Sequence, residues 1–416
     1  MPADNASRSP ARRRKFDIVL YGASGFVGRQ TVAYLAAHAR THADGLRWAL
    51  AGRNVDKLEQ SRKAAGRGAA DAAIIVAAAD DTEALARLAR NTKVVLSTAG
   101  PFDLYGSALV AACVEQGAHY VDITGETPWA REMIERHHAQ AAEQGTRIIP
   151  FCGFDSVPSD LGAWMLMQAM QQRHGAPCVD IKAGFTVRGG VNGGTLASAL
   201  NLLGGDKAKR VAEPFLLNPD GAGQHDPRAH ADPVLPAFDA DFKAWMGPFV
   251  MGPINTRVVR RSAALLGYGP NFHYQEFLRV GAGLIGGAAA VSLSAAMGVS
   301  QAALGLSPVR RVAGWLAPKP GEGPSRARMD SGSFRCDLVG RSAAGQVVRG
   351  CILDQGDPGN RATTKMVCEA ALTLVRNGDD LPGGPAFGGV LTPASGLGGA
   401  LVQRLRHAGM TLQIDP

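Results

Sequence analysis

The amino-acid sequence predicts an α/β protein with a doubly wound parallel sheet, followed by a second α+β domain whose sheet is mainly antiparallel. Short apolar strand-like runs alternate with helix-like runs from Phe16 to Pro150, which is the pattern of parallel strands joined by crossover helices. A glycine-rich turn follows the first of these runs. Beyond Pro177 the pattern changes, and five strand-like runs predict the second sheet with helices on one face: 179–188, 255–260, 272–280, 333–339 and 347–353.

The first strand and its turn have the order of a dinucleotide-binding unit. Phe16–Tyr21 predicts a strand, and a helical pattern follows from about Phe26 to His38. Between them Gly22 allows a tight turn, Gly25 lets the backbone approach a pyrophosphate, and Gly28 lets the helix lie close to the strand. The free N–H groups and the dipole of the helix start favour the phosphate charge, so an ordinary tight turn is the weaker interpretation. We predict a Rossmann-type cofactor site that includes Gly22, Ala23, Ser24, Gly25, Phe26, Val27 and Gly28.

The end of the second predicted strand, 46–51, indicates which cofactor binds. NAD enzymes usually place an acidic residue there for the ribose 2′-hydroxyl, whereas this chain has Gly52 and Arg53. Arg53 is suited to a charge-assisted contact with a 2′-phosphate, with a solvated loop residue as the alternative. We therefore predict NADP(H), with NADPH preferred over NADH. Asp80 is open to two interpretations, an adenine contact and a helix cap. The remaining predicted cofactor residues are Asn54, Lys57, Asp80, Thr98, Ala99, Gly100 and Pro101.

Four side chains are candidates for the chemistry because they follow predicted strands at the ligand-binding edge of the sheet. Tyr105 is a candidate hydrogen-bond donor, or a residue that only packs at a helix start. Asp155 and Ser156 are expected to bind substrate or orient the cofactor, with a helix cap as the alternative for Asp155. Glu126 is a candidate proton donor if burial raises its pKa, and a surface position at a helix start is the alternative.

The composition indicates how many domains to expect and argues against nucleic-acid and metal binding. The 416 residues, 46% of them apolar, are enough for two domains with cores of their own. The net charge of +8 comes partly from a basic leader, which is expected to be disordered. Basic and aromatic residues are not interleaved elsewhere, so a nucleic-acid partner is not expected. The six cysteines form no CxxC pair and no cluster with zinc spacing, so no metal is expected and the thiols are predicted to be reduced and mostly buried. Without a secretory signal, a cytoplasmic location is predicted.

The segment Val280–Val309 contains no charged residue, and it is bordered by Arg279 and by Arg310-Arg311. Its length is sufficient to span a bilayer, but its many Gly, Ala and Ser residues make insertion only mildly favourable. Three interpretations stay open: a membrane span, a helical hairpin that is buried or touches a membrane, and a pair of core helices. The sequence favours the hairpin, with peripheral membrane association left open.

Several motifs together resemble the saccharopine dehydrogenase-like oxidoreductases, and within them the trans-acting enoyl reductase branch. These motifs are GASGFVG, AGRN, TAGPFDLYG, YVDITGE, GFDSVPSDLG, APKPGEGP and GGVLTPAS. The resemblance covers nearly the whole chain from Phe16 onward. It implies an NADPH-dependent reductase for an enoyl or keto group of an acyl, polyketide or lipid-type substrate, carried by a synthase or carrier protein. Two alternatives are an amino-acid-type saccharopine-like dehydrogenase and a non-catalytic nucleotide-binding protein at a membrane or lipid surface.

The resemblance also implies how the chain is divided. The substrate domain is expected to be an insertion, after which the last part of the chain returns to the first domain. A homodimer is expected. The predicted segments are a basic leader at 1–14, an NADP-binding Rossmann domain at 15–158, an inserted substrate and dimerisation domain at 159–360, and returning helices and a strand at 361–416.

Overall fold

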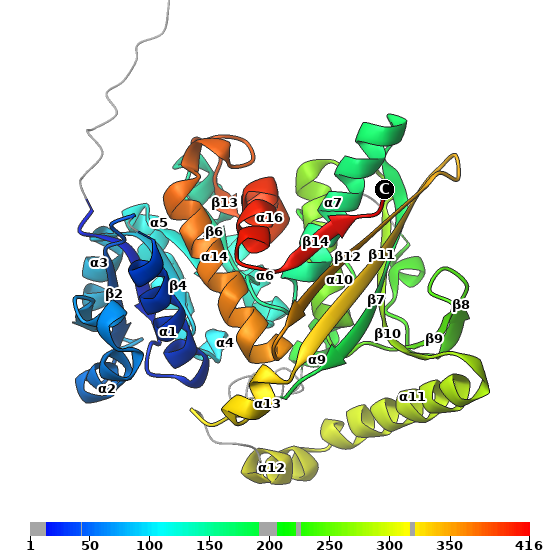
Figure 1. Cartoon of the computed structure of the whole chain (residues 1–416), viewed down its shortest axis with the longest axis horizontal. Coiled ribbons are helices and arrows are strands. Elements are labelled where there is room, and N and C mark those ends of the chain that lie inside the picture. Colours follow the sequence, from blue (N-terminus) through cyan, green and yellow to red (C-terminus); the bar gives the residue numbers. More distant parts are fainter. Residues whose placement is uncertain (1–13, 43, 191–205, 222–225, 317–320) are drawn as a thin grey trace, which may run out of the picture.

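The computed structural model describes residues 14–42, 44–190, 206–221, 226–316 and 321–416. Two seven-stranded sheets stand side by side with helices between them and around them (Figure 1). Most of the predicted leader lies outside the described residues. The sequence also predicts a helix from a cap at Asn192–Thr195 to Leu203, and this segment lies outside the described residues too.

The first sheet is parallel throughout and has the strand order β13-β6-β5-β4-β1-β2-β3. From the central strand β1 the chain first builds one side of the sheet and then, from β4, the other. The carboxyl ends of β1 and β4 therefore form the switch point at which such sheets bind ligands, and the predicted doubly wound sheet is confirmed. Its strands are β1 Phe16–Tyr21, β2 Trp48–Gly52, β3 Ala73–Val76, β4 Thr92–Ser97, β5 His119–Asp122, β6 Arg147–Ile149 and β13 Gly389–Val390.

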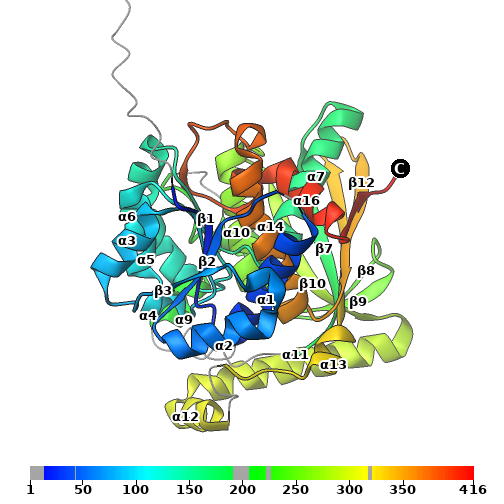
Figure 2. The ribbon, with the colours of Figure 1, turned by 60° about the vertical axis from the view of Figure 1, so that its left-hand side comes forward.

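Helices cover both faces of this sheet, because alternate side chains of β1 point to opposite sides. Ile18 and Leu20 belong to a core shared with α1 and α14, whereas Val19 and Tyr21 belong to a core shared with α3, α5 and α6. Figure 2 shows α1 and α14 together on one side. The helices of this half are α1 Phe26–Thr41, α2 Val55–Ala65, α3 Thr82–Arg90, α4 Phe102–Tyr105, α5 Ser107–Gln116, α6 Thr127–Glu143 and α14 Thr363–Arg376, with a 3-10 turn at Arg67–Ala69.

The second sheet has the order β14-β12-β11-β7-β10-β9-β8, and its pairs are antiparallel except for β7 with β10. The predicted mainly antiparallel sheet is confirmed. Its strands are β7 Cys178–Arg188, β8 Ala237–Asp239, β9 Ala244–Gly247, β10 His273–Gly281, β11 Ser333–Ser342, β12 Val347–Gln355 and β14 Thr411–Ile414. The other helices are α7 Val157–His174, α9 Asp206–Val211, α10 Gly252–Leu266, α11 Gly283–Gly305, α12 Ser307–Leu316, α13 Arg326–Asp330, α15 Pro393–Gly396 and α16 Gly398–His407, with short 3-10 or π turns at Pro227–His230, Pro358–Ala362 and Gly378–Asp380.

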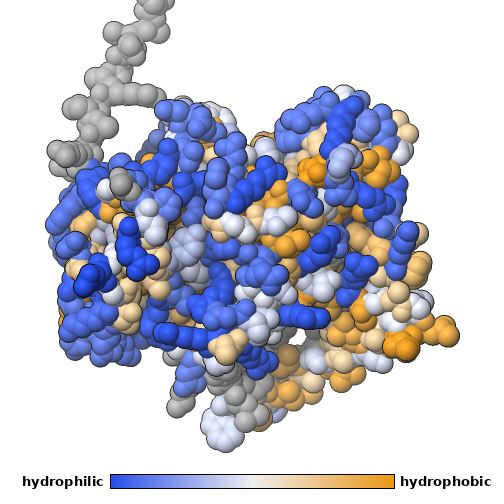
Figure 3. Space-filling view, viewed as in Figure 1, coloured by the Kyte–Doolittle hydropathy of each residue, from blue (hydrophilic) through white to orange (hydrophobic). Residues whose placement is uncertain are grey.

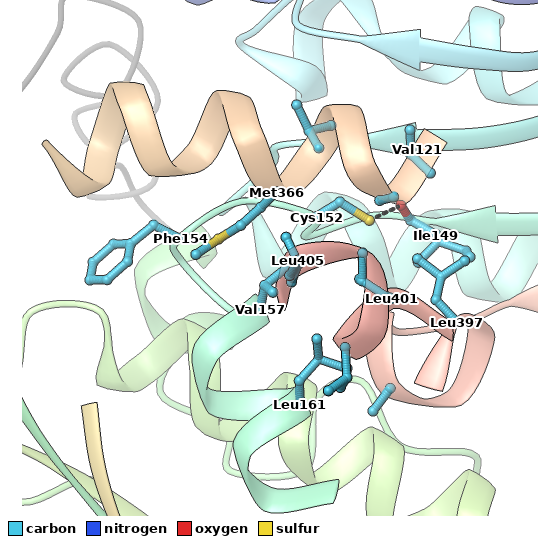
Figure 4. Close-up of a cluster of buried hydrophobic side chains, with 14 of the residues drawn as sticks. Val121, Ile149, Cys152, Phe154, Val157, Leu161, Met366, Leu397, Leu401 and Leu405 are labelled. Atoms are coloured by element: carbon cyan, nitrogen blue, oxygen red, sulfur yellow. Dashed lines mark hydrogen bonds between the residues drawn. The ribbon is translucent and has the colours of Figure 1, made fainter. Parts of the chain in front are cut away.

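A continuous hydrophobic core joins the two sheets. Figure 4 shows part of this core, to which Val121 and Ile149 of the first sheet, Met366 of α14 and Leu401 of α16 all contribute. Cys152 lies in this core, and its thiol donates to the carbonyl oxygen of Ile149 at 3.3 Å. All six cysteines are unpaired and buried, as predicted.

The strand predicted at 255–260 is wrong, because these residues lie within α10. Pro253 in the first turn and Gly267, the left-handed C-cap, delimit this helix. Val258 and Val259 are buried in it, so tertiary packing overrides their preference for strands.

The last part of the chain also differs from its prediction. α14 does return to the first sheet, but the final strand β14 pairs with β12 of the second sheet. The short strand β13, which was not predicted, pairs with β6 of the first sheet instead. Leu412 of β14 is buried in the core between the sheets, and this burial fixes the strand there.

The predicted hairpin at 280–309 is wrong as well. Residues 283–305 form the single helix α11, and α12 follows after one residue. α11 is the one helix among the described residues that is long and apolar enough to cross a membrane, and little of it is buried, which also rules out a core helix pair.

Candidate functional site

The glycine turn after β1 is too tight for side chains. Gly22 has a φ of +84°, and a Cβ added there would lie 2.9 Å from the amide nitrogen of Ala99. A Cβ on Gly28 would lie 2.1 Å from the carbonyl oxygen of Gly22. The N-cap of α1 is Gly25, so no side chain caps the first N–H groups of this helix. These uncapped donors and the space that the glycines leave fit a pyrophosphate.

The turn after β4 lies directly beside the glycine turn. The amide of Thr98 donates to the carbonyl oxygen of Tyr21 at 2.9 Å, and its hydroxyl donates to that of Gly22 at 3.2 Å. Ala99 touches Gly22. The structure therefore places residues 98–101 at the switch point, next to the predicted phosphate site.

The predicted 2′-phosphate site lies at the ends of β2 and β3. Arg53 is exposed, and its charge and that of Asp80 both act on the buried phenol of Tyr21, whose pKa is raised mainly by burial. Asp81, not Asp80, caps α3 by accepting the amide of Ala84 at 2.9 Å, so the capping interpretation of Asp80 is wrong.

Asn54 and Lys57 belong to the start of α2. The side-chain oxygen of Asn54 accepts the amide of Lys57 at 2.9 Å and caps the helix. The Lys57 side chain is exposed on the same turn as Arg53.

A segment from the far end of the second domain completes the rim of the glycine turn. Arg29 donates to the carbonyl oxygens of Ser24 and Gly321, both at 2.9 Å. Gly323 lies so close to the Phe26 ring that an added Cβ would be 2.5 Å from it. Sequence reasoning noticed this APKPGEGP stretch as part of a resemblance but did not place it at the site.

Glu126 is fully buried, so the surface interpretation is wrong. One carboxylate oxygen accepts the amide of Phe102 at 2.8 Å, and the other accepts that of Asp103 at 3.1 Å. The carboxylate thus fixes the start of α4, because it accepts hydrogen bonds from N–H groups that have no partner within the helix. Tyr105 is the last residue of α4 and is 41% exposed, so the buried Glu126 positions the short helix that carries it.

Asp122, which sequence reasoning missed, anchors the loops after β5 and β6. One of its oxygens accepts the amides of Thr124 at 3.0 Å and Phe151 at 3.2 Å, and the other accepts the Tyr120 hydroxyl at 2.8 Å. Burial raises the pKa of Asp122 to about 7. Phe151 has a φ of +65°, a strained value that turns the chain sharply after β6 toward Asp155.

Asp155 is half-buried between the loop after β5 and α10. A Cβ on Gly125 would lie 3.5 Å from its Oδ2 and 3.1 Å from Cδ1 of Ile254. Loss of hydration raises the pKa of Asp155 to about 7. Ser156, not Asp155, is the N-cap residue of α7. Within the described ranges no hydrogen bond is formed to the Asp155 carboxylate.

Ser156 opens a buried polar network that sequence reasoning missed, because Asn255 was assigned to a strand. Its hydroxyl donates to the amide oxygen of Asn255 at 3.3 Å, and the Asn255 amide nitrogen donates to Glu276 at 2.7 Å. The hydroxyls of Ser159 and Tyr274 donate to the other oxygen of Glu276 at 2.8 and 2.9 Å. Burial outweighs these donors and raises the pKa of Glu276 to about 8.

The loops after β1, β4, β5 and β6 therefore meet at one edge of the first sheet. This edge holds the glycine turn, Tyr105 and Asp155, and the second domain covers it through α10 and residues 321–324. Among the described side chains no group of His, Cys, Asp and Glu could hold a metal ion. The fold and the glycine turn define a dinucleotide-binding α/β protein.

Comparison with known proteins identifies the family. Residues 18–149 match the family described as the saccharopine dehydrogenase NADP-binding domain. A trans-acting enoyl reductase from Mycobacterium leprae is 37% identical, with 96% of this chain and 98% of that protein aligned. One from Mycobacterium tuberculosis is 35% identical over 97% of this chain and 98% of its own length. The chain belongs to the saccharopine dehydrogenase-like oxidoreductases, in the trans-acting enoyl reductase branch, and it is an NADP-dependent oxidoreductase.

A solved structure supports the fold. Saccharopine dehydrogenase (L-Glu forming) from Saccharomyces cerevisiae superposes with a TM-score of 0.52 at 14% sequence identity. The match covers 96% of this chain and 99% of the yeast chain, so both sheets belong to the shared architecture.

Two glycine variants should separate cofactor binding from folding. A Cβ on Gly25 meets only the Gly22 carbonyl oxygen, at 3.3 Å, so we expect Gly25→Ala to fold and to bind NADPH about tenfold more weakly because the methyl group displaces the phosphate. The Gly28→Ala methyl group would clash with backbone, and we expect a loss of about 1–3 kcal/mol in the free energy of unfolding. Thermal unfolding and fluorescence titration measure both effects, and equal unfolding temperatures in the two variants would contradict this account.

Arg53→Ala should lower the affinity for NADPH by about tenfold and leave that for NADH unchanged, because only NADPH carries the 2′-phosphate. Fluorescence titration with both cofactors measures the two dissociation constants. Lys63→Ala removes an exposed charge from the far end of α2 and is the matched control. An equal loss of affinity for both cofactors would show that Arg53 does not bind the 2′-phosphate.

Glu276→Gln should make stability less dependent on pH. Because the folded pKa of about 8 lies above the ordinary value of 4.5, the folded state keeps a proton that the unfolded state has released. The free energy of unfolding therefore falls as pH rises from 4.5 to about 8, by at most about 1.4 kcal/mol per pH unit. Thermal unfolding across this range should show a shallower decline for Glu276→Gln, whereas the exposed control Glu143→Gln should follow the parent protein.

Proposed function

We propose that the protein reduces the carbon–carbon double bond of an enoyl group in an acyl or polyketide substrate that a synthase or carrier protein presents. The observation that carries this proposal is the similarity, over nearly the whole chain, to proteins named trans-acting enoyl reductases. The site is compatible with this reaction, because it combines the dinucleotide turn with an exposed phenol and a carboxyl group whose pKa burial raises to about 7. NADPH, when bound, supplies the hydride that the β-carbon receives.

In this proposal two side chains stabilise the negative charge of the enolate and supply the proton. The Tyr105 hydroxyl donates a hydrogen bond to the thioester oxygen, on which negative charge develops as an enolate forms. Asp155 gives its proton to the α-carbon, and a pKa of about 7 keeps a large fraction of it protonated at neutral pH. Glu126 and Ser156 act as positioning residues, since their polar atoms hold α4 and the start of α7.

The proposed cofactor residues keep the roles that the sequence predicts for them. The backbone of residues 22–28 binds the pyrophosphate, Arg53 with Lys57 binds the 2′-phosphate, and residues 98–101 line the nicotinamide side. The four predicted segments stay a proposal, with β14 assigned to the second sheet. The homodimer stays a prediction.

Asp155→Asn should abolish most of the turnover without loss of cofactor binding. With an enoyl thioester as substrate, we expect kcat to fall by about a hundredfold, because general acid catalysis contributes at least that factor. In the parent protein kcat should fall as pH rises through about 7, and the variant should lose this dependence. NADPH oxidation, followed by absorbance, measures kcat and its dependence on pH. Asp71→Asn, on the exposed turn before β3, is the control.

The same assay decides between the alternatives. Oxidation of NADPH with an enoyl thioester but not with a β-keto thioester supports the proposed reaction. Turnover of saccharopine with NADP⁺ would instead establish the amino-acid-type dehydrogenase. Tight NADPH binding without turnover of any of these substrates would leave the non-catalytic nucleotide-binding protein.

A further inference from the structure

Helix α11 packs on the second sheet by one narrow side and leaves the rest of its surface in solvent. Gly287 lies against Trp245, where an added Cβ would be 2.9 Å from the ring, and Ala290 is fully buried. Leu284 and Ile285, in contrast, are 94% and 87% exposed. Figures 1 and 2 both place α11 along one border of the molecule. Large apolar side chains gathered in this way mark a surface that another phase or molecule covers.

The exposed apolar surface continues beyond α11, and we call it the apolar border. Phe238 of β8 adjoins it through an edge contact with Trp245, at 6.0 Å between ring centroids. In α12, Trp315 is 84% exposed. Figure 3 shows apolar side chains gathered over α11. The apolar border consists of Phe238, Leu284, Ile285, Val291, Val299, Leu306, Val309, Val312 and Trp315.

The charged residues within α11 and α12 have one sign. From residue 280 to 321 the sequence contains no Asp or Glu, but it contains Arg310, Arg311 and Lys319. Arg311 is exposed on α12, and Arg326 is exposed on the nearby α13. An apolar helix followed by an exposed Trp and Arg residues is the composition of segments that lie in the interface of a membrane with anionic lipids.

We propose that α11 and α12 dock on the surface of a membrane that contains anionic lipids, with α11 lying in the interface. A membrane span does not fit, because Gly287 and Ala290 keep one side of α11 against protein. A second copy of the chain fits less well, because a two-fold axis through the apolar border would bring the exposed Arg311 of both copies toward one interface. This inference does not depend on the reaction that the protein catalyses.

Vesicle co-sedimentation of the full chain tests the proposal. We expect binding to vesicles of phosphatidylcholine with phosphatidylglycerol, and weaker binding to phosphatidylcholine alone. Leu284→Glu with Ile285→Glu should weaken binding at least about tenfold, because two apolar side chains no longer enter the lipid. Arg311→Glu should weaken binding to the anionic vesicles only. Val347→Glu, which is 38% exposed at the start of β12 and outside the apolar border, is the matched control and should bind like the parent protein.

NADPH titration and the unfolding temperature confirm that each variant is folded. The proposal is overturned if the parent protein stays in the supernatant with both vesicle types, or if the Leu284 and Ile285 double variant binds as tightly as the parent protein. It is also overturned if analytical ultracentrifugation shows a dimer that this double variant dissociates while no vesicle binding occurs. That last result would assign the apolar border to a second copy of the chain.

Discussion

The close approach of α1 to the turn after β1 is the constraint on which the site depends. No side chain fits between Gly28 and the carbonyl oxygen of Gly22, so the helix begins directly over the carboxyl end of the strand. This placement leaves the first N–H groups without a side-chain cap and aims them into the switch point between β1 and β4. The turn after β4 can approach Gly22 only because that residue also lacks a side chain. A binding site for a dinucleotide is thus a consequence of backbone packing, and Arg53 is the residue that we propose for the preference for NADPH.

The two sheets are joined at the same edge by buried polar groups as well as by the hydrophobic core. Ser156 and Ser159 begin α7 just after β6, and Asn255 and Glu276 come from α10 and β10 of the second half. Each of these side chains satisfies a partner that would otherwise be buried without a hydrogen bond, which is costly. The network therefore fixes where the second half sits over the loops after β5 and β6. Asp155 lies between these parts, and its raised pKa follows from that enclosure.

The parallel sheet could be predicted from sequence because its signals are local. Apolar runs, glycine turns and helix caps such as Asp81 each act within a few residues. The position of residues 22–28 and 98–101 at the ends of β1 and β4 could be predicted for the same reason, and their contacts with the cofactor stay a prediction. Long-range contacts could not be predicted: Glu126 looks like a surface residue until α4 folds against it, and Asn255 looks like part of a strand until Pro253 and Gly267 delimit a helix. The role of residues 321–324 depends on Arg29, almost three hundred positions earlier, which no local pattern indicates.

The rim of the cofactor site and the apolar border are close to each other in the sequence. α12 ends at Leu316, and Gly321 already accepts a hydrogen bond from Arg29 beside the glycine turn. In the sequence only four residues separate the end of α12 from Gly321. Because five residues of chain reach at most about 18 Å, docking of α11 and α12 on a membrane would keep the glycine turn near the lipid surface. An acyl chain that leaves a synthase or a bilayer would then reach the enzyme at the side proposed for the cofactor. A long apolar substrate would not have to pass through water, where exposure of its apolar surface is unfavourable.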